Sequence, residues 1–185
     1  MNKSRRGFVP ALLLFILSAV FLLSCASCAA GDNDVLGFLN YPVSADCALT
    51  LKGDGKPEAP VHFSLEVIRR GYGRLIFTDG ELAGCVVSVA PEGVTISEGE
   101  GFAAPLDLPE GAPLTAVVAA FSISPEMISA QFAESGTQAG RISAVCAGGT
   151  AEISVSDGTP RNVAFSGPCG EFTVEIEKYS DSAPA

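Results

Sequence analysis

The feature that most limits the fold is an alternation of apolar and polar residues that repeats from about residue 41 to residue 178. In residues 61–67, for example, every odd-numbered position is apolar and every even-numbered position is polar. Successive side chains of a strand point to opposite faces, so this period of two predicts strands with one buried face. The turns between the runs are short, and a parallel neighbour would need a crossover of about a dozen residues or more. The pattern therefore predicts a curved, predominantly antiparallel sheet.

Nine strands are expected, separated by turns rich in Gly, Pro and Asp. They lie within residues 46–52, 61–67, 74–78, 85–89, 94–96, 141–146, 150–155, 162–165 and 171–179. No linker or internal repeat divides them, and 185 residues fit one domain comfortably. We therefore expect a single, mainly β domain over residues 36–179, with eight to eleven strands and a frayed, disordered tail at 180–185.

One segment departs from this pattern and predicts a helix near residues 111–130. Four apolar residues fall at the helical spacing i, i+3, i+4 and i+7: Leu114, Val117, Val118 and Phe121. Pro113 suits the first helical turn, where its missing N–H costs nothing. Residues 114–123 carry no charged side chain. Such a helix must be covered on nearly every side or must face an apolar ligand.

The N-terminus has the pattern of an export signal. Basic residues precede an uncharged apolar run at 8–23, which is shorter than the about 20 residues that span a bilayer. The sequence Leu22-Leu23-Ser24-Cys25 that ends this run resembles a bacterial lipobox. It predicts a lipoprotein signal peptide at 1–24, acylation (palmitate) of Cys25, and a short lipidated tether at 25–35.

Two alternatives to acylation of Cys25 remain open. Cys28 also follows small residues, Ala26 and Ser27, and could be the acylated residue instead. The chain could also carry an ordinary signal peptide cleaved near Ala30, or an uncleaved anchor. With Cys25 as the mature N-terminus, the protein is expected outside the cytoplasm, anchored to the bacterial cell membrane.

The charge balance limits the partners. The chain has 11 Lys and Arg against 21 Asp and Glu; residues 1–24 hold three of the basic residues and no acidic one. From Cys25 onward the balance is 8 against 21, a net charge of −13. Nucleic-acid binding is excluded because it needs clustered basic residues. An acidic protein surface should also be repelled by anionic lipid headgroups. The protein is therefore expected to contact the membrane through its lipid anchor alone.

The order of these elements resembles the lipoprotein-carrier fold of LolA and LolB. The resemblance rests on the lipid-modified N-terminus, the Tyr41-Pro42 entry to the first strand, the meander, the apolar helix in mid-chain, and the last strand at 172–176. In that family an unclosed β-barrel is plugged by helices, which leaves an apolar cavity for acyl chains. The resemblance also implies an arginine that locks the helical lid, with Arg69, Arg70 and Arg74 as the candidates.

On this resemblance the chain has a ligand cavity between barrel and helix. Its lid would be formed by Leu114, Val117, Val118 and Phe121. Its lining would come from Phe63, Leu65, Leu75, Phe77 and Val87. The implied ligand is a lipid, an acyl chain or another apolar molecule. The alternative is a structural or accessory cell-envelope lipoprotein whose interior is packed and holds no ligand.

Four further cysteines allow disulfides in an exported protein. Cys146–Cys169 is the first candidate pair, because both residues lie in the last strands. Cys47, Cys85 and Cys146 also fall on the apolar side of their strands, where a free thiol behaves as a small hydrophobe. The one C-x-x-C motif, at 25–28, lies in the signal region and favours neither a redox nor a zinc site.

Catalytic patterns are scarce. The chain has a single histidine, His62, on the polar side of its strand, and 166–170 lacks the order of a nucleophile elbow. We expect no enzyme, no cofactor and no metal.

Overall fold

The computed structural model describes residues 39–52, 59–99, 101, 103–133 and 139–180. All of them belong to one compact unit, Val35–Ala185. The predicted signal peptide and the tether lie outside the described residues, as do Cys25 and Cys28. Of the predicted C-terminal tail only Ser180 is described, and it is the last residue of a strand.

The structure confirms a mainly β fold with antiparallel pairing throughout. Eleven strands form one sheet in the order β6-β5-β4-β3-β2-β1-β11-β10-β9-β8-β7. Their bounds are β1 Val43–Lys52, β2 Val61–Arg69, β3 Tyr72–Phe77, β4 Cys85–Ala90, β5 Gly93–Glu98, β6 Ala104–Leu106, β7 Ile128–Ala133, β8 Gly140–Cys146, β9 Gly149–Ser156, β10 Thr159–Gly167 and β11 Gly170–Ser180. The strand number lies within the predicted range, and β6 and β7 are the two strands that the alternation did not predict.

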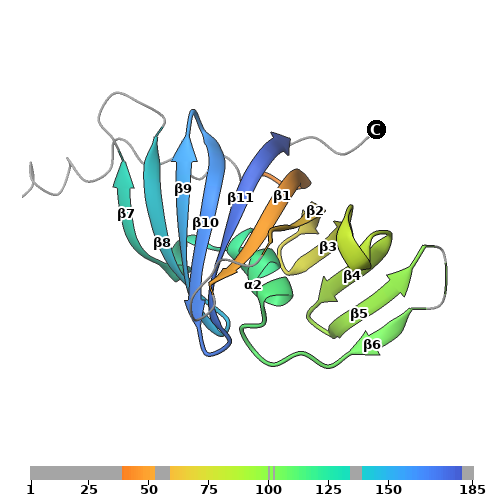
Figure 1. The fold of residues 1–185 in the computed structure, drawn as a ribbon. Coiled ribbons are helices and arrows are strands. Elements are labelled where there is room, and N and C mark those ends of the chain that lie inside the picture. Colours follow the sequence, from red (N-terminus) through yellow and green to blue (C-terminus); the bar gives the residue numbers. More distant parts are fainter. Residues whose placement is uncertain (1–38, 53–58, 100, 102, 134–138, 181–185) are drawn as a thin grey trace, which may run out of the picture. The chain divides into compact units, whose positions relative to one another are not determined.

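The first and last strands meet in the middle of the sheet. β1 pairs with β2 on one side, where Cys47 lies opposite Phe63, and with β11 on the other, where Leu49 lies opposite Val174. The strands therefore divide into two arms, β1–β6 and β7–β11, on either side of this junction (Figure 1). Because β6 and β7 are not paired with each other in the described residues, the sheet is an unclosed barrel, as predicted.

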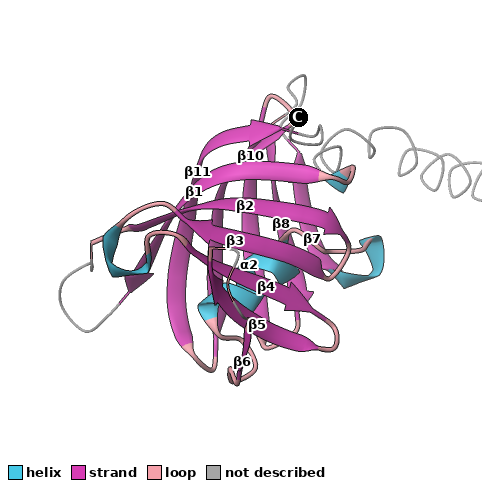
Figure 2. Ribbon diagram, turned by 90° about the vertical axis from the view of Figure 1, so that its right-hand side faces the viewer, coloured by secondary structure: helices cyan, strands magenta, loops and turns pink. Residues whose placement is uncertain are grey.

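Helix α2, Pro113–Ala120, lies between the two arms on the inner side of the curved sheet (Figure 2). It contacts β3 and β4 of one arm and β8, β9 and β10 of the other. Two short 3-10 turns, η2 (Gly80–Leu82) and η3 (Pro125–Met127), also lie in the described part of the chain. In that part the one α-helix lies within the predicted region 111–130, although the predicted second turn is one short 3-10 turn before β7.

A single apolar core joins the inner faces of both arms to the helix. In the first arm the Phe63 and Phe77 rings lie 6.0 Å apart, and in the second the Phe165 and Phe172 rings stack at 4.9 Å. On the outer face of β11, Glu171, Glu175 and Glu177 are exposed, which agrees with the alternation.

Gly73 of β3 lets the helix lie close to the sheet. A Cβ atom at this position would lie only 2.7 Å and 2.9 Å from the two methyl groups of Val118. Side-chain methyls at such distances overlap, so any larger residue at position 73 must displace either α2 or β3.

The first prediction therefore concerns Gly73→Ala. We expect the free energy of unfolding to fall by about 1–3 kcal/mol, the usual cost of overpacking a core. In the background of Val118→Ala, the same substitution should cost much less, because the methyl groups that it meets are gone. Urea unfolding of the two single variants and the double variant measures this coupling. Additive losses would contradict the close helix–sheet contact.

Candidate functional site

The predicted lid residues lie on the helix and face the core. Val117 and Val118 lie in α2 and Phe121 at its C-terminal cap, and each side chain is 1% exposed. Leu114, in the first turn, is half-buried and packs against the same core. The structure therefore brings the four residues together on the inner side of the sheet.

The predicted lining residues are also buried in this core, and they come from one arm alone. Phe63 and Leu65 lie on β2, Leu75 and Phe77 on β3, and Val87 on β4. The second arm contributes a matching inner surface that sequence reasoning left out: Ile142, Ala144, Ala151, Ile153, Val163, Phe165, Phe172 and Val174. The alternation of apolar residues within 141–176 could have predicted this inner surface of the second arm.

The helix fills the space between the arms. Three surface hollows of about 610, 420 and 430 Å³ are formed by strand residues and their turns, and no α2 residue lines any of them. In this conformation the predicted cavity is occupied by the side chains of α2 itself.

The N-terminal end of α2 rests on the second arm. Gly111 lies against Gly148 in the β8–β9 turn, so closely that a Cβ atom on Gly148 would lie 2.3 Å from the Gly111 nitrogen. Nearby, the Cys169 thiol donates to the Glu110 carbonyl at 3.3 Å. These contacts fix where the chain enters the helix.

The C-terminal end of α2 is held by hydrogen bonds from the first arm. The Tyr41 hydroxyl donates to the Phe121 carbonyl at 2.7 Å, and Arg70 Nη2 lies 3.4 Å from the Ile123 carbonyl oxygen. The Ser122 hydroxyl accepts from the Gly71 N–H at 3.0 Å and donates to the Val118 carbonyl at 2.7 Å. We call Tyr41, Arg70 and Ser122 the latch.

The structure separates the three candidate arginines. Arg74 forms an ion pair with Glu66 at 3.6 Å, and Arg69 stacks on the Tyr72 ring at 3.7 Å. Of the three, Arg70 contacts the segment that follows α2, at the Ile123 carbonyl.

Burial raises the pKa of Tyr41, although the Arg70 hydrogen bond and charge oppose the rise. The phenol is therefore protonated at neutral pH and is able to donate its hydrogen bond to the helix end.

His62 lies on the outer face, away from the helix. Its Nδ1 is 2.6 Å from Asp79 Oδ2, and its Nε2 is 3.9 Å from Glu177 Oε1. The hydrogen bonds from the His62 side chain and N–H lower the pKa of Asp79. Within the described residues, no three His, Cys, Asp or Glu side chains are placed to hold a metal ion.

The four described cysteines are free thiols: Cys47, Cys85, Cys146 and Cys169. Burial, with smaller effects of Asp46 and Glu177, raises the pKa of Cys47 to about 12, so this thiol is inert at neutral pH. Cys146 is buried and Cys169 is exposed, and the disulfide between them stays a prediction.

Three solved structures, one of them a LolA superfamily protein, are similar in fold to this chain. The LolA superfamily protein, from Nitrosomonas europaea, matches with a TM-score of 0.49 and 8% identity, over 82% of this chain and 91% of its own. MucB matches with a TM-score of 0.41 and 14% identity, over 82% of this chain and 59% of its own. A domain from Vibrio parahaemolyticus named for outer membrane lipoprotein sorting matches at 0.39 and 9% identity, over 78% of this chain and 86% of its own.

At 8–14% identity, these likenesses concern the fold alone. No family model and no curated protein matches the chain. In the described part of the chain, no helix is long and apolar enough to cross a membrane.

The latch generates the second prediction. Tyr41→Phe should lower the free energy of unfolding at neutral pH by about 0.5–1.5 kcal/mol, because it removes one hydrogen bond. Burial raises the folded-state pKa of Tyr41 above its usual 10.0. The wild-type contribution is therefore present below pH 10 and is lost as pH rises through the folded-state pKa. Urea unfolding from neutral pH to above pH 10 should show this loss of stability in the wild type. Tyr41→Phe should not show it, because the variant has no phenol to ionise.

Tyr72→Phe is the matched control, because the Tyr72 hydroxyl bonds only an exposed carboxylate, that of Glu92, at 3.2 Å. A loss at neutral pH as large as that of Tyr41→Phe would argue against a special role for the latch.

Proposed function

We propose that the protein binds an apolar ligand, a lipid or an acyl chain, between the sheet and helix α2, and that it acts as a binding protein rather than an enzyme. The single observation that carries the proposal is an uncharged helix that fills the inner side of an unclosed sheet. This helix contacts both arms and is not hydrogen-bonded into the sheet's strand ladder.

The chemistry of the interior supports an apolar ligand. Within the described residues the only buried polar ones are Ser122 and Ser124, and both follow the helix. A polar group carried into the core would therefore find few partners, at a cost of about 1–3 kcal/mol or more for each unpaired group. An acyl chain needs no such partner and gains by burial, at roughly 0.8 kcal/mol per CH₂.

The attachment of the helix supports its movement as a lid. At its C-terminal end the helix is attached to the first arm by the few latch hydrogen bonds, from Tyr41 and Arg70 to main-chain carbonyls and from the Gly71 N–H to Ser122. At its N-terminal end, Gly111 has a φ of 80°, a conformation natural to glycine, and joins the helix to residues 107–110 outside the core. We propose that α2 swings about this end when the ligand enters.

The proposal includes a membrane anchor. The apolar run at 8–23 and the lipobox-like sequence ending at Cys25 support lipidation, with the protein outside the cytoplasm on the cell membrane. The strongly acidic remainder favours a domain that stands off the lipid surface on its tether.

A second candidate function is an accessory envelope protein with a packed interior and no ligand. The observation that favours it is the burial of Val117, Val118 and Phe121 at 1% exposure, with the larger hollows elsewhere. The two candidates differ in whether α2 leaves the sheet.

The third prediction separates these candidates with Val118→Asp. In the binding protein, a carboxylate on the lid drives α2 outward, so the sheet persists and binding of an apolar fluorophore falls by about tenfold or more. In the packed protein the buried carboxylate has no escape, and the whole domain loses several kcal/mol of stability. Dye titration and thermal unfolding by circular dichroism measure the two effects.

Thr115→Asp is the control, because Thr115 is half-buried in the first helical turn, where a carboxylate interacts well with the helix dipole. It should be tolerated. Equal loss of stability in both variants, with no dye binding by the wild type, would reject the lid. Lipid that co-purifies after gentle extraction, seen by native mass spectrometry, would support it.

The fourth prediction concerns the anchor. Cys25→Ala should abolish palmitate labelling and leave the chain unprocessed or released from the membrane, because the acylated thiol is gone. Cys28→Ala should label normally. Labelling that persists in Cys25→Ala and disappears in Cys28→Ala would assign the anchor to Cys28.

A further inference from the structure

The two ends of the sheet differ in how they resist pairing with another chain. β6 is three residues long and has Pro105 at its centre, which lacks an N–H group, so this end is protected. β7 has six residues, Ile128–Ala133, with no charged residue and no proline. A bulge near Ser129 leaves 130–133 as its regular part. No strand in the described residues pairs with the far side of β7.

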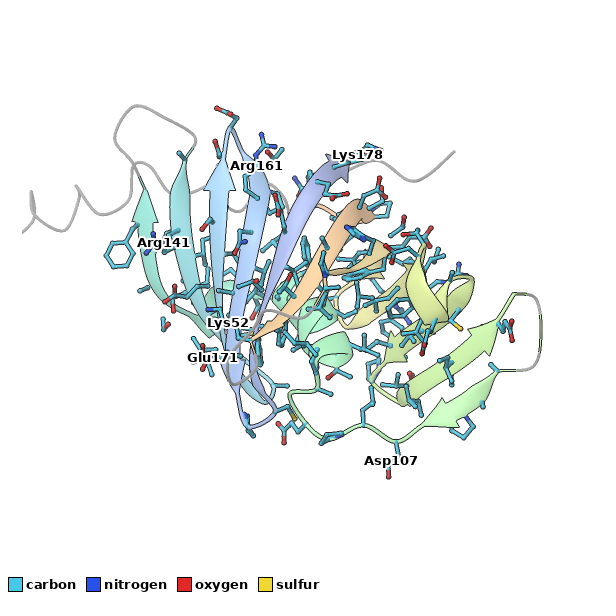
Figure 3. The ribbon with its side chains drawn as sticks, viewed as in Figure 1. Lys52, Asp107, Arg141, Arg161, Glu171 and Lys178 are labelled. Carbon is cyan, nitrogen blue, oxygen red and sulfur yellow. The ribbon has the colours of Figure 1, made fainter. Side chains whose placement is uncertain are left out.

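The outer face beside this edge carries an exposed aromatic ring and a cation. Phe132 is 67% exposed and lies opposite Arg141 of β8. Arg141 has no carboxylate partner among the described residues. Both border the hollow of about 610 Å³, together with Ser154 and Ser156. Figure 3 shows Arg141 in the β7–β9 region of the sheet. This edge therefore places a basic group beside an exposed ring on a chain whose net charge is −10.

The inner face of β7 also has an unmet hydrogen-bonding need. Gln131 lies opposite the buried Ile142, so its side chain is on the inner side. Its amide nitrogen Nε2 is buried and has no hydrogen-bond partner among the described residues. A buried donor without an acceptor is costly, and an added strand would bring acceptors to this side.

We propose that β7 is a docking edge for an extended segment of a partner protein that carries a glutamate on its outer face. Free main-chain N–H and C=O groups along an edge are matched only by another extended chain. An added strand would lie about 9.6 Å from β8, two strand spacings away. Glutamate and arginine side chains together bridge that gap across Phe132. An apolar residue two positions from the glutamate would pack on the Phe132 ring.

A second copy of this chain fits the edge less well. Two β7 strands side by side offer no carboxylate to either Arg141, since β7 has no acidic residue. Dimerisation would also join two chains that each carry a net charge of −10. Docking at β7 uses no residue of the latch or of α2, so it stands or falls separately from binding in the interior.

The test is the fifth prediction and uses the full chain in detergent micelles with a labelled, capped peptide. The peptide has about eight residues, alternating valine and threonine with one central glutamate, which is an ordinary strand length. We expect fluorescence anisotropy to show binding, and hydrogen exchange to show protection in 128–133 with none at β6. A peptide with glutamine in place of glutamate should bind about tenfold more weakly. A peptide with a central proline should not bind.

Variants on the outer face assign the contacts. Arg141→Gln should abolish the preference for the glutamate peptide, and Phe132→Ala should weaken both peptides severalfold. The controls are Val145→Ala, 58% exposed on β8, and Arg161→Gln on β10, and both should leave affinity unchanged. Figure 3 shows Arg161 and Arg141 on different strands.

Three results would overturn the proposal. The first is that the peptide does not bind at millimolar concentration, and the second is that the wild-type chain binds the glutamate and glutamine peptides equally well. The third is that protection of β7 from hydrogen exchange depends on protein concentration alone. The last result would make a second copy the occupant.

Discussion

Helix α2 and the inner face of the sheet each require the other. The helix has eight residues and no charge, and a helix of that length is marginal by itself in water. The two arms each present a row of apolar side chains on the inner side, and within the sheet they are joined by the pairing of β1 with β11. Burying a Val, Leu or Phe side chain contributes about 1.5–3 kcal/mol. The shared core therefore stabilises the helix and holds the curvature of the open sheet at once.

Because helix and sheet share one core, a ligand that displaced α2 would have to replace the apolar contacts of the helix. The latch hydrogen bonds contribute about 0.5–1.5 kcal/mol each, whereas the apolar contacts of Val117, Val118 and Phe121 together contribute several times as much. In the proposed function, moving α2 outward would cost mainly apolar burial, which an acyl chain entering the same space would restore. The latch would then set where the helix returns, because its hydrogen bonds lie at one end of the helix.

The alternation predicted nine strands correctly because their inner positions carry large apolar residues. It missed β6, which is three residues around Pro105, and β7, where Ser, Ala and Gln blur the period of two. The four lid residues follow from helical spacing, and they do share the inner side. The sequence did not show which of Arg69, Arg70 and Arg74 contacts the segment after α2. The direction of each side chain depends on how β2 pairs with β3, and this pairing is irregular near Arg69.

The strand missed by sequence reasoning is the one that gives the sheet its asymmetry. β7 contributes Ile128 to the core, and its outer side chains are alanine and serine apart from one phenylalanine. An added chain would supply main-chain hydrogen bonds at that edge and a carboxylate for Arg141. The inner side, by contrast, is mainly apolar, with Ser122, Ser124 and the Gln131 amide as its buried polar groups among the described residues. Under the two proposals, an extended peptide would bind at β7 and an acyl chain in the interior, through separate sets of residues.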